Sequence, residues 1–383
     1  MTGLPAPAPE ALHHSRRVTG HIRAAIEAEG GWISFARYME LALYAPGLGY
    51  YAGGAEKFGT GGDFITAPAL TPLFGRVLAR QFAPVLAASG GGILELGAGT
   101  GRLAAQIRSE LHVRGIEAPY AILDVSADLR ARQQETLQAV PGSAQGEAVT
   151  WLDALPETFT GIIFGNEVLD ALPVHLLHWA EQGPLERGVI TLRDGFAWED
   201  RPITDPTLRG RALALNLPAG YLSEISLAAP ALIGELGRRL GQGLLLFIDY
   251  GFGRSEYYHP QRHMGTLRAH YRHHALDDPF YLPGLCDLTA HVNFSAVAEA
   301  GMKSGLQLAG YTSQANFLLN AGITDLLLQT SPAEAAAYLP QANAVQRLVS
   351  PAEMGELFKV IAFTREIEMP LMGFSRGDRC HAL

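Results

Sequence analysis

The sequence contains little cysteine and little charge. Only Cys286 and Cys380 are cysteines among 383 residues, which excludes a disulfide framework and a cysteine-based zinc cage and makes a reducing compartment the expected setting. Charged residues make up 17% of the chain, and the sequence has 29 Lys and Arg and 38 Asp and Glu, which gives a net charge of −9. Because phosphate neutralisation needs clustered basic residues, this balance argues against a nucleic-acid binder. It favours a basic peptide or protein as partner.

Long apolar runs are also missing. The longest strongly apolar run is Gly243 to Ile248, far short of the about 20 residues that a membrane span requires. The first ten residues hold three prolines and no Lys or Arg, which does not fit a targeting peptide. We therefore expect a cytoplasmic bacterial protein without a membrane span. Its length and 48% hydrophobic residues allow one large domain with appendages, or two domains.

The central motif of the chain is a strand, a glycine-rich turn and a helix in direct succession. Ile93 to Leu96 reads as a buried strand, and apolar residues recur at helical spacing from Leu103 to Leu111. The turn between them, GAGTG, takes its three glycines from Gly97, Gly99 and Gly101. Glycine permits positive φ values and close approach of a ligand, and the helix beyond points unpaired N–H groups at that ligand. The motif therefore predicts a cofactor site.

The spacing of the glycines favours one cofactor. A dinucleotide fingerprint reads GxGxxG, whereas this turn reads GxGxG and follows Glu95. A carboxylate at that position suits the amino group and sulfonium of S-adenosylmethionine better than a pyrophosphate. The alternative is a glycine-rich turn that binds nothing.

Two aspartates follow on the next strands. Asp124 ends the predicted strand Tyr120–Val125, 23 residues beyond Gly101, and this offset suits hydrogen bonds to the ribose hydroxyls of the cofactor. Its alternative role is to cap the following helix, which Ser126 could also do. Asp153, in the predicted edge segment Thr150–Leu155, could bind the adenine amino group or be an exposed loop residue.

Polar residues gather after the predicted strand Gly161–Gly165. Ligands of open α/β sheets bind at the carboxyl ends of strands, so Asn166, Glu167 and Asp170 should face the bound substrates. Glu167 and Asp170 share one side if this segment is a helical turn. Two carboxylates beside a methyl donor suit a guanidinium, which they orient and from which they accept a proton. The alternative is that both cap a helix.

Other segments predict helices, a lid and an insertion. Helical spacing covers Ser15–Glu29, Phe35–Leu43 and Leu70–Ala83, the last ended by Pro84. Tyr44–Asp63 is a loop with seven glycines and is expected to cover the active site. Alternating segments from Leu176 to Ile203, with a turn at Asp194-Gly195, predict a β insertion. The histidine-rich stretch 259–291 matches no zinc template, so we expect no metal.

The sequence resembles the MidA-like family of S-adenosylmethionine-dependent methyltransferases along nearly its whole length. The resemblance rests on Gly49-Tyr50-Tyr51, Gly62-Asp63-Phe64-Ile65-Thr66, Phe74-Gly75, Glu95-Leu96-Gly97, Asn166-Glu167 with Asp170-Ala171-Leu172-Pro173, Asp249-Tyr250-Gly251, Gly265-Thr266-Leu267-Arg268, Asp287-Leu288-Thr289-Ala290, Phe317-Leu318 and Met354-Gly355 before Leu357-Phe358. It departs at Ala69, often glutamate in the family, and at Asn293, often aspartate.

The resemblance implies an α/β fold, a Rossmann-like class I methyltransferase sheet of seven strands with an N-terminal helical cap and a β-rich insertion. The expected ranges are 1–90 for the cap and lid, 91–180 with 236–383 for the core, and 181–235 for a β-hairpin insertion. Gly62, Asp63 and Thr66 join the expected cofactor contacts. Mitochondrial members are protein arginine methyltransferases that assist assembly of respiratory NADH:ubiquinone oxidoreductase, so the implied partner is a protein, such as a respiratory complex subunit.

Together these features predict an enzyme that transfers the methyl group of S-adenosylmethionine to a protein side chain, most simply arginine. Its first rival is an assembly factor that binds the cofactor with little turnover. A second rival, a nicotinamide-dependent oxidoreductase, conflicts with the glycine spacing and Glu95.

Overall fold

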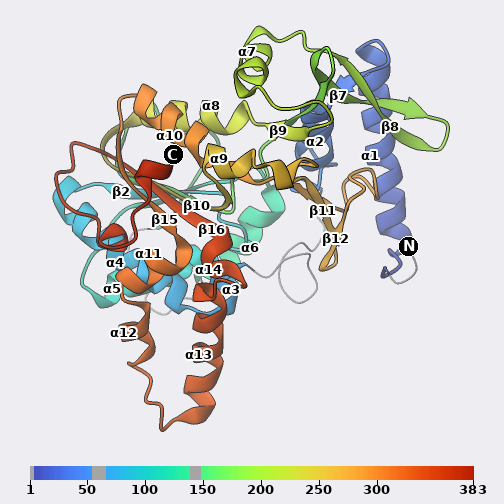
Figure 1. Cartoon of the computed structure of the whole chain (residues 1–383). Coiled ribbons are helices and arrows are strands. Elements are labelled where there is room, and N and C mark those ends of the chain that lie inside the picture. Colours follow the sequence, from blue (N-terminus) through green and yellow to red (C-terminus); the bar gives the residue numbers. More distant parts are fainter. Residues whose placement is uncertain (1–3, 54–65, 139–147) are drawn as a thin grey trace. The chain divides into compact units, whose positions relative to one another are not determined.

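The computed structural model describes residues 4–53, 66–138 and 148–383, and the chain divides into two compact units (Figure 1). Unit 1 contains Met1–Phe64, Asp170–Ala229 and Arg254–Asn293; unit 2 contains Ile65–Leu169, Pro230–Gly253 and Phe294–Leu383. These boundaries differ from the predicted ranges. Residues 65–90 belong to unit 2, because helix α4 (Leu73–Ser89) packs there, and residues 254–293 belong to unit 1.

Seven strands of unit 2 follow one another in an eight-stranded sheet, which confirms the predicted α/β class. In sheet order they are β15 (Gln307–Ser313), β16 (Phe358–Arg365), β10 (Leu240–Phe252), β5 (Phe159–Asn166), β2 (Gly92–Leu96), β3 (Tyr120–Leu123) and β4 (Thr150–Leu152). The run from β10 to β4 is parallel, and β16 is antiparallel to both of its neighbours. The carboxyl ends of five adjacent strands therefore meet at one edge.

Helices cover both faces of this sheet. Phe82 of α4 packs on Phe164 of β5, with ring centroids 5.2 Å apart. On the other face, a Cβ at Gly301 of α10 would come within 2.4 Å of Phe363 on β16, so only glycine lets this helix approach the strand. Besides α4, the helices of unit 2 are α3 (Ala67–Leu70), α5 (Arg102–Val113), α6 (Ala127–Gln138), α8 (Ala228–Arg239, which begins in unit 1), α10 (Phe294–Lys303), α11 (Gln314–Asn320), α12 (Ile323–Leu327), α13 (Ala335–Val349), α14 (Met354–Leu357), η2 (Met372–Phe374) and η3 (Cys380–Ala382).

The prediction that Pro84 ends the helix before the sheet was wrong. Helix α4 continues through Pro84 to Ser89, and Gly90 terminates it in the left-handed conformation with φ 64°. An interior proline costs about 3 kcal/mol. Burial offsets this cost, because Phe82, Val85 and Leu86 around the proline are all buried, and each such side chain contributes about 1.5–3 kcal/mol.

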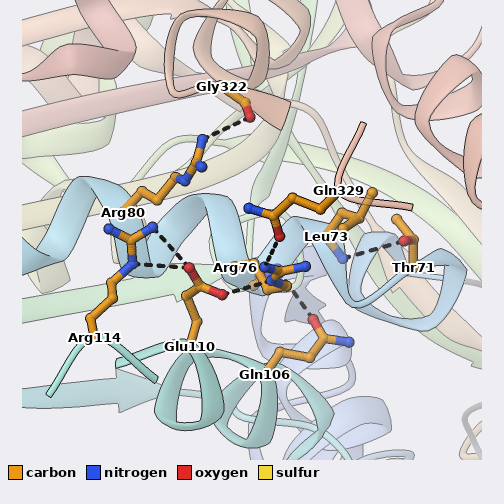
Figure 2. Close-up of polar contacts among 10 residues, drawn as sticks. Thr71, Leu73, Arg76, Arg80, Gln106, Glu110, Arg114, Gly322 and Gln329 are labelled. Carbon is orange, nitrogen blue, oxygen red and sulfur yellow. Dashed lines mark hydrogen bonds and ion pairs between the residues drawn. The ribbon is translucent and has the colours of Figure 1, made fainter. Parts of the chain in front are cut away.

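A polar network joins α4, α5 and the segment around α12 (Figure 2). Glu110 is 5% exposed, and its two oxygens accept from Arg76 Nε at 2.6 Å and from Arg114. Arg76 also donates to the side chain of Gln329 at 2.7 Å, and Arg80 donates to the carbonyl of Gly322 at 3.0 Å. The carboxylate of Glu110 thus compensates two guanidinium groups at the packed surface of α5.

We expect Glu110→Ala to lower the free energy of unfolding by about 2–3 kcal/mol, because it removes charged hydrogen bonds from two arginines. Glu353→Ala is the matched control. Its carboxylate lies 3.5 Å from Arg347 with both side chains about half exposed, and such pairs contribute about 0–1 kcal/mol. Urea denaturation of both variants checks this, and equal losses would contradict the assigned role of Glu110.

Unit 1 combines helices with two small sheets. Four strands follow the order β1 (Ile33–Ser34), β7 (Gly183–Leu192), β6 (His175–Ala180) and β9 (Leu222–Ile225), and β8 (Gly195–Pro202) pairs with β7. The second sheet has the order β12 (His274–Leu276), β11 (Arg268–Tyr271) and β13 (Asp287–Thr289). The remaining elements are α1 (Pro9–Ala28), α2 (Phe35–Tyr44), α7 (Pro206–Leu215), α9 (Arg254–Tyr257), η1 (Pro260–Arg262) and β14 (Val292–Asn293).

The predicted amphipathic helix and β insertion of unit 1 are present. Val18, Ile22 and Ile26 of α1 are buried in its core, as their spacing indicates. The β7–β8 hairpin pairs Leu192 with Gly195 and so turns one residue before the predicted Asp194-Gly195. Among the helices described, none has the length and apolar character needed to cross a membrane.

Candidate functional site

The glycine-rich turn has the backbone conformation that its sequence predicts. It follows β2 and leads into α5, and Gly97, Gly99 and Gly101 all have positive φ, at 61°, 54° and 79°. These values lie in the left-handed region, which L side chains rarely adopt. Glycine is therefore required at three alternate positions of one turn.

Two of the glycines are also closely approached by neighbouring segments. A Cβ at Gly101 would lie 3.0 Å from Cα of Gln133 on α6, and one at Gly97 would lie 3.1 Å from a methyl carbon of Val168. The turn thus lies against α6 on one side and against the segment that follows β5 on the other. Val168, the residue after Glu167, therefore lies beside the cofactor turn.

Glu95 of β2 is a buried acid. Its side chain is 2% exposed, and Oε2 accepts a hydrogen bond of 2.7 Å from the Tyr120 hydroxyl on β3. Burial raises the pKa of this carboxyl from its usual 4.5 to about 8, and the charge of Asp124 adds to the rise. Near neutral pH, Glu95 therefore keeps its proton in the free protein, and a nearby cation would favour its release.

We expect a pH-dependent part of the stability to disappear in Glu95→Gln. Between the usual pKa of 4.5 and the folded value of about 8, the folded chain holds a proton that the unfolded chain releases. The stability that comes from this proton is fully present below pH 4.5, and it is lost as the pH rises through the folded pKa of about 8. Urea denaturation at several pH values from about 5 to about 8 measures it. A stability difference between wild type and variant that stays constant with pH would contradict the assignment.

Asp124 lies just beyond β3 and is 7% exposed. Its Oδ1 accepts from the backbone N–H of Ser126 at 3.0 Å, and its Oδ2 accepts from Nε2 of Gln133 at 2.8 Å. The hydroxyl of Ser126 accepts from the N–H of Leu129 at 3.3 Å and so caps α6. The helix-capping function thus belongs to Ser126, and the carboxylate of Asp124 is held at the sheet edge instead.

Gln133 is a buried polar residue beside the glycine turn that the sequence did not single out. It is fully buried, and its amide contacts both Asp124 and the carbonyl of Gly99. The available signal was a polar residue between Leu129 and Leu137, on the face of α6 that should be apolar.

The other expected cofactor residues have different surroundings. The carboxylate of Asp153 is 90% exposed and lies 2.7 Å from Arg130. Thr66 precedes α3 in an extended conformation, and its side chain makes no capping hydrogen bond. Gly62, Asp63 and the end of the predicted lid fall in residues 54–65, outside the described residues. These positions stay predictions.

The segment after β5 forms no helical turn, so the condition under which Glu167 and Asp170 would share one side is not met. Glu167 has φ 55°, in the left-handed region, and its N–H donates to the carbonyl of Ile248 at 2.9 Å. Since no helix begins at this segment, neither Glu167 nor Asp170 caps one. The Nδ2 of Asn166 donates to Oε1 of Glu167 at 3.0 Å, and its buried Oδ1 has no hydrogen-bond partner among the described residues.

Asp249 on β10 explains the shape of this segment. Its carboxylate has 0% exposure, and Oδ2 accepts from the N–H groups of Val168 at 3.1 Å and Leu169 at 2.7 Å. Oδ1 accepts from the N–H of Tyr250 at 3.0 Å. These bonds fold the chain back directly after Glu167, so a strained residue is held by the neighbouring strand. The sequence showed a carboxylate at the end of this strand but not its function.

Asp170 belongs to unit 1, where another polar group is buried. The Tyr51 hydroxyl lies 3.0 Å from each carboxylate oxygen of Asp287, and the Tyr51 ring stacks on Tyr44 at 5.5 Å. Burial raises the pKa of Tyr51 well above its usual value, and the carboxylates of Asp287 and Asp170 add to the rise. The carbonyl of Asp170 accepts from the N–H of Ala290 at 3.0 Å. The charges of two buried carboxylates thus help to raise the pKa of one tyrosine of unit 1.

No group of three or more His, Cys, Asp or Glu side chains in the described part of the chain is arranged to hold a metal ion. In the histidine-rich stretch, burial lowers the pKa of His270 to about 4.

Residues 77–312 match a family described as "Putative S-adenosyl-L-methionine-dependent methyltransferase". The chain belongs to this family. This methyltransferase therefore uses S-adenosyl-L-methionine as its cofactor, as the glycine turn predicted. The residues fit that cofactor: the turn leaves its backbone bare, Asp124 is fixed at the sheet edge, and the buried acid Glu95 lies two residues before Gly97. Their individual contacts with the cofactor stay predictions.

Solved and curated relatives agree with this membership. The methyltransferase is 53% identical to a COG1565 superfamily member from Burkholderia thailandensis crystallised with S-adenosyl-homocysteine, with a TM-score of 0.96 and 100% of each chain covered. It is 28% identical to "Protein arginine methyltransferase NDUFAF7, mitochondrial" of Danio rerio, over 90% of this chain and 86% of that protein. For the Homo sapiens protein of the same name the identity is 27%, over 89% and 82%.

Proposed function

We propose that this methyltransferase methylates arginine side chains of a protein. The observation that carries the proposal is the geometry after β5, where Glu167 is held in a left-handed conformation with Asn166 bonded to its carboxylate. Val168 of the same segment lies against Gly97 of the cofactor turn. The names of the relatives in Danio rerio and Homo sapiens support arginine as the acceptor.

The chemistry requires a group that orients a guanidinium and removes its proton. When bound, S-adenosyl-L-methionine supplies an electrophilic methyl group. A guanidinium stays charged in water and is a poor nucleophile until a carboxylate polarises it. The carboxylate of Glu167 can accept its proton, and the bond from Asn166 Nδ2 to Oε1 of Glu167 helps to orient that carboxylate. The buried Oδ1 of Asn166 can accept a second N–H of the guanidinium.

Two acidic side chains of unit 1 are buried. Asp170 and Asp287 are 5% and 4% exposed, and the charges of both raise the pKa of Tyr51. The net charge of −9 attracts a basic polypeptide. We therefore propose a protein partner, with a respiratory complex subunit as the first to test, and a reducing cytoplasmic setting consistent with two free cysteines.

Comparative proteomics tests this function. We expect a strain that lacks the gene to lose a small set of monomethyl- or dimethyl-arginine marks, and a plasmid copy of the wild-type gene to restore them. A copy with Glu167→Gln should not restore them. If deletion removes no arginine mark, the proposal fails. If deletion also slows growth and a copy with Glu167→Gln restores it, the result would instead favour the assembly factor that binds the cofactor with little turnover.

A further inference from the structure

Gln133 is an unusual residue for its position. Helix α6 buries Leu129, Gln133 and Leu137, which follow one another at a spacing of four. Two of the three are apolar, as expected for a helix face that packs inward. Burying an amide costs free energy unless its donors and acceptor are hydrogen-bonded. A fully buried glutamine here therefore implies specific partners.

The partners of Gln133 come from three neighbouring strand ends. Its Nε2 donates to the carbonyl of Gly99 at 3.0 Å, in the turn after β2, and to Oδ2 of Asp124 at 2.8 Å, beyond β3. Its Oε1 accepts from the indole N–H of Trp151 on β4 at 2.9 Å. An amide has two N–H donors, so both are used. One side chain thus fixes the glycine turn, Asp124 and β4 relative to one another.

These bonds also determine how Asp124 can bind a ligand. Ser126 N–H and Gln133 Nε2 each occupy one oxygen of the carboxylate and hold its plane fixed. A carboxylate oxygen can accept more than one hydrogen bond, which is the chemistry that recognition of a neighbouring pair of hydroxyls needs. A carboxylate fixed in this way loses less entropy on binding than a mobile one.

We propose that Gln133 is a positioning residue for the cofactor, which makes the protein discriminate adenosyl ligands by their ribose hydroxyls. It acts through Asp124 and the Gly99 carbonyl. The inference rests on the cofactor turn and on the ribose assignment of Asp124, and it is independent of the proposed arginine acceptor.

Calorimetry with two ligands tests the inference. The probes are S-adenosyl-homocysteine and its analogue in which 2′,3′-dideoxyribose replaces ribose. We expect wild type to bind the natural ligand about 10- to 100-fold more tightly than the analogue, because hydrogen bonds to a charged carboxylate are lost. Gln133→Met removes the amide at similar size, and the ratio should fall to about threefold or less.

A matched control separates positioning from folding. Gln81 on α4 is also fully buried, and its Oε1 accepts from the N–H of Gly373 at 2.9 Å. Gln81→Met should lower the melting temperature yet leave the ligand ratio unchanged. In Asp124→Asn, the ratio of the affinities for the two ligands should fall to about one. If Asp124→Asn keeps it, the ribose assignment fails and the inference fails with it, whatever the acceptor of the methyl group is.

A second variant makes the test independent of a folding failure. In Gln133→Glu, a carboxylate replaces the donor beside Asp124 and repels it at high pH, whereas the protonated form can again donate one hydrogen bond. We expect its affinity relative to wild type to recover by about tenfold between pH 8 and pH 6. A folded Gln133→Met with the wild-type ratio overturns the inference. So does an unfolded Gln133→Met together with a Gln133→Glu whose relative affinity does not change with pH.

Discussion

Glu167→Gln is expected to lower methyl transfer by about 10²–10⁴-fold while the affinity for S-adenosyl-homocysteine stays within about threefold of wild type. The amide keeps the size of the side chain and the hydrogen bond with Asn166, but it cannot accept a proton from a guanidinium. Glutamine also tolerates the φ of 55° at this position about as well as glutamate. The loss should therefore appear in turnover rather than in folding or cofactor binding.

Glu157→Gln is the control for this variant. Glu157 is an exposed acid that precedes β5, so it lies at the opposite end of the strand from Glu167. The same change of charge there should leave turnover and melting temperature unchanged. Turnover of Glu167→Gln equal to that of wild type would remove the proton-accepting role from Glu167.

Gly101→Val should abolish cofactor binding, which is the second large effect we expect. A β-branched residue is strained at φ 79°, and its Cβ would lie 3.0 Å from the backbone of Gln133. The turn or α6 must then shift, and the surface that approaches the cofactor changes with it. Calorimetry should detect no binding of S-adenosyl-homocysteine at concentrations that saturate wild type.

Gly115→Val distinguishes this effect from strain alone. Gly115 follows α5 with φ 70°, and an added Cβ there would meet nothing within 4 Å. Both variants therefore carry similar backbone strain, and only Gly101→Val changes the cofactor turn. Equal loss of affinity in the two variants would attribute the effect to general destabilisation.

The local parts of the site could be predicted from sequence because their signals lie close together in the chain. The strand, glycine turn and helix around Gly99 follow from one periodic segment of about 20 residues. Asp124 was selected by its offset from that turn, and its contact with the ribose stays a prediction. The bond from Leu129 N–H to the Ser126 hydroxyl shows that Ser126 caps α6.

The remaining parts depend on residues that meet only in the folded chain. The shape after β5 is determined by Asp249, 81 positions beyond Val168, so local spacing could not decide whether Glu167 and Asp170 share one side. The pairing of Tyr51 with Asp287 spans 236 positions. Local propensity also led to the wrong prediction that the helix ends at Pro84. The burial that offsets the cost of the proline comes from packing on the sheet, which local propensity does not include.

The proposed reaction is the transfer of a methyl group from S-adenosylmethionine to arginine in a protein. Its most direct test is incubation of the purified protein with S-adenosylmethionine carrying a deuterated methyl group and with extract of the deletion strain, followed by peptide mass spectrometry. We predict that the label appears on arginine side chains of one or a few proteins and that Glu167→Gln leaves it absent. Label on another residue type, or on no protein when S-adenosylmethionine demonstrably binds, would contradict the account.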